Sequence, residues 1–132
     1  METMQFDLIT PEATFFSGAA VQIDMPGTLG DFGVLPGHIP LISTLRMGVI
    51  KIYTGKDTTK RVFVAGGVAK VKSDSCTIVT EQLTDLDNFA RSDAEKCLSE
   101  AKTMLDNALD ESEKSEAIRG VEVAEALISA VS

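Results

Sequence analysis

The sequence predicts a β-sandwich or flattened barrel of antiparallel strands, followed by an antiparallel hairpin of two α-helices. Apolar side chains recur at every second residue up to Thr80, and at every third or fourth residue after Asp87. Short strands at close spacing favour an antiparallel sandwich over alternating strands and helices. We therefore expect a strand domain over residues 1–86 and a helical hairpin over residues 87–132.

The predicted strands are short alternating segments bounded by turn residues. They cover residues 4–8, 21–25, 49–53, 61–64, 68–72 and 76–80. Pro26-Gly27, Gly66-Gly67 and Ser73-Asp74-Ser75 are typical turn signals between such segments. No helical period interrupts this part of the chain.

Residues 27–45 have the most distinctive composition of the chain, with four glycines, two prolines and the only histidine. Pro36 and Pro40 fix φ and withhold two amide donors, so this stretch cannot be a central strand. We predict a stiff loop that presents Asp31 and His38 in a fixed geometry.

After residue 88 the apolar period is that of a helix. One stripe covers residues 89–109 and a second covers residues 118–131, with four polar residues, 110–113, between them. A short polar link between two amphipathic helices predicts an antiparallel hairpin, and its acidic residues are interpreted as capping and turn residues. Gly120 is expected to weaken the second helix by about 1 kcal/mol relative to alanine.

Composition excludes several functions. The 132 residues are 44% hydrophobic and 5% aromatic, which predicts an aliphatic core. The net charge of −8 disfavours binding to nucleic acid or to anionic lipid, whose phosphates attract Lys and Arg. The sequence shows no signal-peptide pattern and no apolar run of ~20 residues, so direct membrane insertion is not expected. A basic protein partner is compatible with this charge.

Residues that could carry catalysis or hold a metal are scarce. His38 is the only histidine, and no Gly-x-Ser-x-Gly segment accompanies it. Cys76 and Cys97 are isolated and are expected to be reduced, buried thiols rather than zinc ligands. Gly27, Gly30 and Gly33 have the wrong spacing for a dinucleotide fingerprint. We expect a chain that is not an enzyme by itself and holds no metal.

Three segments, in the right order, resemble the epsilon subunit of F-type (proton-translocating) ATP synthases of bacterial type. They are Phe16-Ser17-Gly18, Gly30-Asp31-Phe32-Gly33-Val34-Leu35-Pro36-Gly37-His38-Ile39-Pro40-Leu41 and Val64-Ala65-Gly66-Gly67-Val68-Ala69-Lys70-Val71. The resemblance is close over about the first 88 residues. It implies a β-sandwich with a helical hairpin, and a place in the central stalk that couples proton transport to ATP synthesis. It also implies a peripheral location on the cytoplasmic face of the bacterial inner membrane, through the complex.

The resemblance implies where the partners bind. Asp31 matches a position that meets polar loops of the membrane c-ring, and His38 one that lies near the gamma subunit. Gly30, Phe32 and Gly33 belong to the same contact segment. An acid that faces basic c-ring loops would be electrostatically complementary. The residues themselves allow a plainer interpretation, in which His38 caps neighbouring carbonyls and Asp31 is a turn residue between glycines.

Some members of the family bind ATP at the hairpin, and the resemblance to their motif is incomplete. Glu81 and Asp87 match, but Arg91 stands one residue late, which turns its side chain by ~100° around a helix. Arg119 is the remaining candidate for this site. Asp87 is alternatively the N-cap of the first helix. The expected cofactor is therefore none, with ATP at the hairpin left open.

In the family the hairpin also meets the alpha and beta subunits and can restrain ATP hydrolysis. In the inhibitory members, basic residues of the second helix meet an acidic segment of beta. Here the second helix has Lys114 and Arg119 against Glu116, Glu122 and Glu125. An acidic helix is repelled by an acidic partner, so we expect weak inhibition or none.

Three functions therefore compete. The first is a rotor adaptor that joins gamma to the c-ring, and the second is an ATP-sensing regulator that acts through the hairpin. The third is an unrelated β-sandwich that binds a small ligand, for which Phe32 and Tyr53 are the only candidate aromatic residues.

Overall fold

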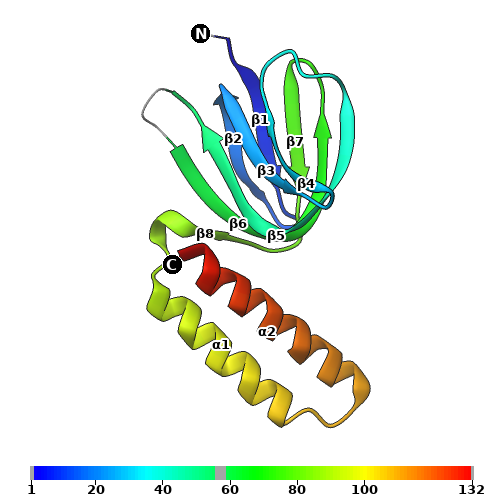
Figure 1. The fold of residues 1–132 in the computed structure, drawn as a ribbon, viewed down its shortest axis with the longest axis vertical. Coiled ribbons are helices and arrows are strands. Elements are labelled where there is room, and N and C mark those ends of the chain that lie inside the picture. Colours follow the sequence, from blue (N-terminus) through cyan, green and yellow to red (C-terminus); the bar gives the residue numbers. More distant parts are fainter. Residues whose placement is uncertain (1, 56–58, 132) are drawn as a thin grey trace. The chain divides into compact units, whose positions relative to one another are not determined.

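The computed structural model describes residues 2–55 and 59–131, which form two compact units, Met1–Asp87 and Asn88–Ser132 (Figure 1). The first unit is a β-sheet and the second a pair of helices, as the sequence predicts. The strands are β1 (Met4–Ile9), β2 (Thr14–Ala20), β3 (Gln22–Gly27), β4 (Gly30–Val34), β5 (Leu41–Tyr53), β6 (Thr59–Val71), β7 (Ser75–Val79) and β8 (Leu83–Asp85). A 3₁₀ turn, Leu86–Asn88, precedes the helices α1 (Arg91–Asp106) and α2 (Glu111–Val131).

The strand order in the sheet is β2-β1-β7-β6-β5-β3-β4, and β8 pairs with β6. The path begins at β2 and ends at β4, so the sheet is not closed into a barrel. Every strand pair is antiparallel except β1 with β7, which is parallel. The prediction of a purely antiparallel sheet is wrong at that pair, because an alternating pattern does not encode the direction of a partner distant in sequence.

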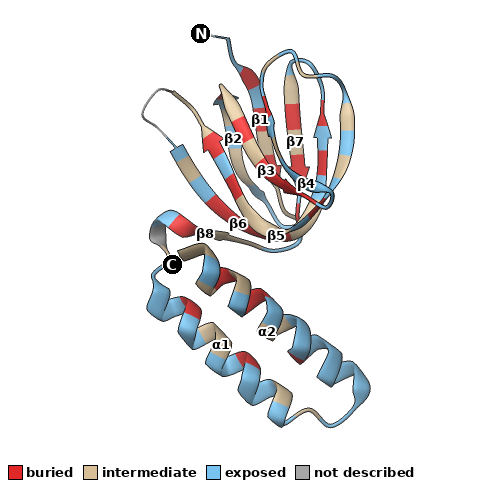
Figure 2. Ribbon diagram, viewed as in Figure 1, coloured by how far each residue is buried: buried red, intermediate tan, exposed pale blue. Residues whose placement is uncertain are grey.

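Buried residues recur along the strands (Figure 2), and they form one mainly aliphatic core. Phe6 and Leu8 of β1 share this core with Ile23 of β3 and Ile50 of β5, so both ends of the sheet path enclose it. Phe6 is fully buried and its ring lies 5.8 Å from that of Phe16. The sheet therefore folds over its own inner face as a sandwich, and the packed core supports its outer face.

β6 is a single strand of 13 residues, and the predicted turn at Gly66-Gly67 is wrong. Both glycines have positive φ, +102° and +148°, yet the register with β5 continues on either side of them. β6 pairs with β8 before the two glycines and with β7 after them. The glycines bend the strand where its partner changes, and the Thr80 hydroxyl donates to the Gly66 carbonyl at 2.6 Å there.

Residues 27–45, predicted to be one stiff loop, contain β4 and the start of β5. Among the described residues β4 pairs with β3 alone and is an edge strand, so the expectation that this stretch holds no central strand is correct for β4. It is wrong for residues 41–45, because they belong to β5, which lies between β3 and β6 in the sheet. Pro36 and Pro40 both lie in the connection between β4 and β5. The alternation of β2 went unrecognised because its sequence, Thr-Phe-Phe-Ser-Gly-Ala-Ala, has no period of two.

The buried residues of the two helices include several small side chains, beside Val123 and Leu127 of α2. Ala94 and Ala101 of α1 are buried, as are Ala117 and Ala124 of α2. A Cβ atom placed on Gly120 would lie 3.6 Å from the Cβ of Ala101, an ordinary contact distance. Gly120 therefore packs against α1 at a point where the two helices approach closely.

The start of α1 differs from the prediction. Its N-cap is Ala90, whose amide donates to Asp93 Oδ2 at 3.1 Å. The interpretation of Asp87 as N-cap is therefore wrong, because the 3₁₀ turn intervenes. Asp87 lies in that turn, and its amide donates to Asp85 Oδ1 at 3.1 Å.

Asp110 caps α2, as the sequence predicts. Its Oδ1 accepts the Glu113 amide at 2.8 Å, and Glu113 Oε2 accepts the Leu109 amide at 2.8 Å. Asp110→Ala is expected to lower the free energy of unfolding of the hairpin by about 1 kcal/mol, measured by loss of helical circular dichroism in urea. Asp106→Ala is the matched control. Because an acid in the last turn of α1 opposes the helix dipole, removing Asp106 should not lower the free energy of unfolding. An equal loss in both variants would contradict the capping role.

The two thiols differ in burial. Cys76 is fully buried in the sandwich core, as expected, whereas Cys97 is only half-buried on α1, so that expectation is wrong for Cys97. Both are free thiols. Burial disfavours the thiolate and raises the pKa of Cys76 from 9.0 to about 12.

We expect one thiol, Cys97, to react with a disulfide reagent at pH 8, and Cys76 to react only when urea unfolds the strand unit. The unfolded Cys76 thiol ionises from about pH 9, while the folded one stays protonated to about pH 12. The stability that this difference contributes is therefore present below pH 9 and lost as the pH rises toward 12. Cys97→Ser removes the fast phase and serves as the control. Rapid reaction of Cys76 in that folded variant would contradict the assignment.

Candidate functional site

The turn between β3 and β4 is a tight, exposed projection of the strand unit. Gly27 pairs with Gly30 across it, and Thr28 and Leu29 form its tip. Gly30 has a φ of +140°. A Cβ atom on Gly27 would lie 2.7 Å from the Gly30 carbonyl oxygen, so this turn requires glycine there. The side chain of Leu29 is fully exposed.

Strand β5 holds this turn from the side. The Thr28 amide donates to the Thr44 carbonyl at 3.1 Å, and the two threonine hydroxyls are 2.9 Å apart. Arg46 Nη1 donates to the Gly27 carbonyl at 2.6 Å, and Arg46 Nη2 pairs with Asp31 Oδ1. Asp31 remains three-quarters exposed although it is paired. The turn is therefore attached to β5 by both backbone and side-chain contacts.

Arg46 is a site residue that the sequence reasoning missed. It lies between the predicted loop, residues 27–45, and the next predicted strand, residues 49–53, so the sequence assigned it no element and no orientation. The available signal was an arginine between the apolar Leu45 and Met47, in a chain with few basic residues.

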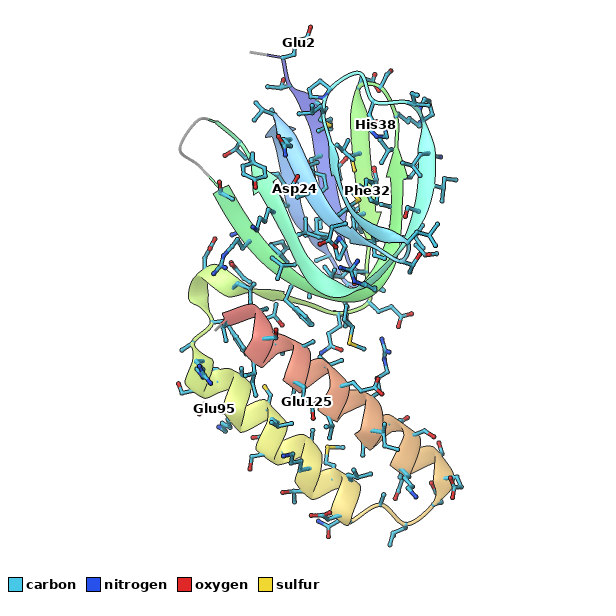
Figure 3. All side chains as sticks on the ribbon, viewed as in Figure 1. Glu2, Asp24, Phe32, His38, Glu95 and Glu125 are labelled. Carbon is cyan, nitrogen blue, oxygen red and sulfur yellow. The ribbon has the colours of Figure 1, made fainter. Side chains whose placement is uncertain are left out.

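His38 does not lie beside Asp31. The turn at residues 28–29 and the connection at residues 35–40 are at opposite ends of β4, which is five residues and hence ~16 Å long. The expectation of one loop that presents both residues is thus wrong. His38 and Phe32 are marked on this segment in Figure 3.

The connection from β4 to β5 has its own internal contacts. The His38 amide donates to the Leu35 carbonyl at 3.1 Å, and the ring donates from Nδ1 to the Ile39 carbonyl at 2.7 Å. The Gly37 amide donates to the Ser73 carbonyl at 2.7 Å, which places this connection beside the β6–β7 turn. The His38 ring therefore contacts a neighbouring carbonyl, as the plainer interpretation expects.

A group of exposed residues covers the outer face of β5, β6 and β7. Val68 pairs with Thr44 on one side and with Val79 on the other, and Lys70 pairs with Ile42. Ile42, Val68 and Val79 are exposed large apolar residues. We call this surface the β5–β7 patch; a shallow hollow in it is lined by Ile42, Val68, Lys70, Lys72, Ser75, Thr77 and Val79. The patch combines an apolar centre with a basic margin, although the chain as a whole is acidic.

The four nucleotide candidates are divided between the two units. Glu81 and Asp87 belong to the strand unit, where Lys60 Nζ lies 3.9 Å from Asp87 and 3.1 Å from Asp85. In the hairpin, Arg91 Nε contacts Glu95 at 3.2 Å. Arg119 adjoins Gly120, which faces Ala101, ten residues and hence ~15 Å along α1 from Arg91. The two arginines therefore do not converge within the hairpin.

In residues 2–55 and 59–131, no group of three or more His, Cys, Asp or Glu side chains is arranged to hold a metal ion. Neither described helix is long and apolar enough to cross a membrane.

Comparison with known proteins identifies the family. The family described as "ATP synthase, Delta/Epsilon chain, beta-sandwich domain" matches residues 3–85. The ATP synthase epsilon chain of Rhodospirillum rubrum is 42% identical over 129 residues, 98% of this chain and 96% of that protein. The epsilon chain of Rhodospirillum centenum is 38% identical over 118 residues, 86% of this chain and 81% of its own length.

Solved structures share the fold. One is a chain of the Euglena gracilis mitochondrial ATP synthase, in a structure of OSCP/F1/c-ring, with a TM-score of 0.80 and 20% identity over 98% of this chain and 82% of that one. Another is in the central stalk and c-ring of Tetrahymena thermophila mitochondrial ATP synthase, with a TM-score of 0.63 and 16% identity over 96% and 97% of the two chains. The matched sandwich, the helical hairpin and the bacterial relatives lead to one conclusion. The chain belongs to the family of ATP synthase epsilon chains.

Proposed function

We propose that this chain is the central-stalk adaptor that joins the gamma subunit to the c-ring and so couples proton transport to ATP synthesis, without catalysing a reaction itself. The observation that carries this proposal is the β5–β7 patch, whose apolar centre is exposed on a rigid sheet. An exposed apolar group with a polar margin is typical of a protein-interaction surface. The Tetrahymena structure that shares this fold is one of a central stalk and c-ring, which fits an adaptor.

The two surfaces of the strand unit suit two different partners. The β5–β7 patch and the adjoining loop with His38 offer a broad apolar area, which suits a stable contact with gamma. The β3–β4 turn is narrow and carries Leu29 and Asp31 at its end, which suits contact with the short polar loops of the c-ring. Gly30, Phe32 and Gly33 shape the strand behind this turn.

We assign the hairpin a secondary role, in contact with the alpha and beta subunits. Glu95 on α1 and Glu125 on α2 are both exposed and belong to its acidic surface (Figure 3). Because this acidic surface is repelled by an acidic segment of beta, we expect the hairpin to inhibit ATP hydrolysis only weakly. Through its partners the chain would lie on the cytoplasmic face of the bacterial inner membrane.

Copurification tests the adaptor function. The chain, tagged at its C-terminus, is expressed in its source cells and recovered from detergent-solubilised membranes, with partners identified by mass. Recovery of gamma and the c-ring, with alpha and beta, is expected. Recovery of none of them by a folded chain would refute the proposal.

Titration with ATP separates the adaptor from the nucleotide-sensing alternative, because an adaptor needs no nucleotide. Calorimetric titration of the isolated chain is expected to show no saturable binding, since Arg91 and Arg119 do not converge. Saturable binding that Arg91→Gln abolishes would favour the regulator. Glu100→Gln, an exposed change elsewhere on α1, is the matched control.

A further inference from the structure

The β3–β4 turn lacks the conformation that usually closes a two-residue hairpin. The favoured turns of this length need positive φ at one or both central residues. Neither Thr28 nor Leu29 has positive φ, and only Gly30, which follows them, takes such a value. A turn of this kind splays its strands unless other contacts hold them.

Arg46 supplies contacts of that kind. One guanidinium nitrogen, Nη1, donates to the carbonyl of Gly27, the last residue of β3, and the other, Nη2, pairs with Asp31 in β4. The planar fork of arginine makes both contacts at once, which the single ammonium group of lysine cannot do in the same geometry. The guanidinium thus bridges the two strands directly behind the turn.

The pairing also changes how Asp31 can meet a partner. Its Oδ1 is occupied by Arg46, whereas no hydrogen bond to its Oδ2 is found among the described residues. The carboxylate is held in place by one oxygen and can accept a hydrogen bond with the other. Its charge is compensated by the guanidinium, so simple attraction between a bare acid and a basic loop is weakened.

We propose that Arg46 is the positioning residue of the contact between the β3–β4 turn and the c-ring, an inference that rests on the adaptor function proposed above. Arg46 closes the turn, orients Asp31 and presents the exposed Leu29 as a fixed apolar contact. A turn that is already ordered loses less conformational freedom on binding. Arg46 acts through Gly27 and Asp31 and needs no contact of its own with the partner.

The first test uses the isolated full-length chain and requires no partner. The Thr28 amide donates to Thr44 in the closed turn, so its hydrogen exchange reports opening. Arg46→Gln is expected to speed that exchange about tenfold, because the substitution removes one hydrogen bond and one exposed ion pair. Arg61→Gln, at an exposed arginine on β6, is the matched control and should leave it unchanged. Unchanged hydrogen exchange of the Thr28 amide in Arg46→Gln would refute the role of Arg46 in closing the turn.

The second test measures binding of the chain to a purified complex of gamma and c-ring in detergent. Arg46→Gln is expected to bind about tenfold more weakly and Arg46→Lys to fall between it and the unmodified chain. Asp31→Asn and Arg46→Gln should be non-additive, so the double variant binds little worse than Arg46→Gln alone. A residue that only stabilised the sheet would show additive losses and a lower urea midpoint.

The outcomes distinguish the two proposals. If the unmodified chain does not bind the complex, both the adaptor function and this inference are refuted. If it binds, and Arg46→Gln binds equally well or the two losses are additive, only the role of Arg46 is refuted.

Discussion

Gly67→Ala is expected to lower the free energy of unfolding of the strand unit by about 3 kcal/mol. Gly67 has a φ of +148°, a region that residues with a side chain rarely adopt. A Cβ atom there would lie 2.5 Å from the Val79 carbonyl oxygen, which is backbone and cannot move aside independently. The substitution therefore strains β6 and also disturbs its pairing with β7. Urea unfolding followed by tyrosine fluorescence measures the change.

Gly55→Ala is the matched control for this substitution. A Cβ atom on Gly55 meets no atom within 4 Å, and its φ is not positive. Its effect should stay within about 0.5 kcal/mol of zero. Equal stability of Gly67→Ala and Gly55→Ala would show that the bend in β6 does not depend on glycine.

The second large effect is expected at the β5–β7 patch. Val68→Lys should weaken binding to the gamma subunit by roughly a hundredfold, because it replaces the apolar centre of the proposed contact with a charge that must be desolvated. Val68 is already partly exposed at 44%, so the isolated chain should unfold at nearly the same urea concentration as the unmodified one. Binding is measured by surface plasmon resonance on immobilised gamma.

Thr59→Lys makes the same charge change at an exposed position at the other end of β6. It should leave gamma binding unchanged. Equal binding by Val68→Lys and Thr59→Lys would place the gamma contact elsewhere on the sandwich.

Sequence patterns were sufficient for the elements whose burial alternates. Met4, Phe6 and Leu8 face the core and their neighbours do not, so β1 was predicted correctly. The polar link after α1 likewise predicted the hairpin, and Asp110 caps the second helix as expected. In these elements the environment of each residue follows from its near neighbours in sequence.

Features that depend on distant partners were not predictable in this way. The parallel pairing of β1 with β7 brings together strands some seventy residues apart in sequence. Gly66 and Gly67 are turn residues in isolation, yet they bend one continuous strand because β7 and β8 divide its edge between them. A local pattern carries no information about either arrangement.

The candidate site shows the same limit. The sequence selected Asp31 and His38 from a segment rich in glycine and proline, but β4 separates them. Arg46 was missed because its importance comes from contacts with Gly27 and Asp31 across the sheet. The β5–β7 patch was missed because Ile42 fell within a predicted loop, and Val68 and Val79 were assigned no face.

The most direct test of the adaptor function is ATP-driven proton pumping by inverted membrane vesicles from which this chain has been removed. The stripped vesicles are expected to hydrolyse ATP without acidifying, and addition of the unmodified chain should restore acidification, measured by quenching of a pH-sensitive dye. Val68→Lys should fail to restore it at the same concentration. Equal proton pumping by vesicles with and without the chain would contradict the adaptor function.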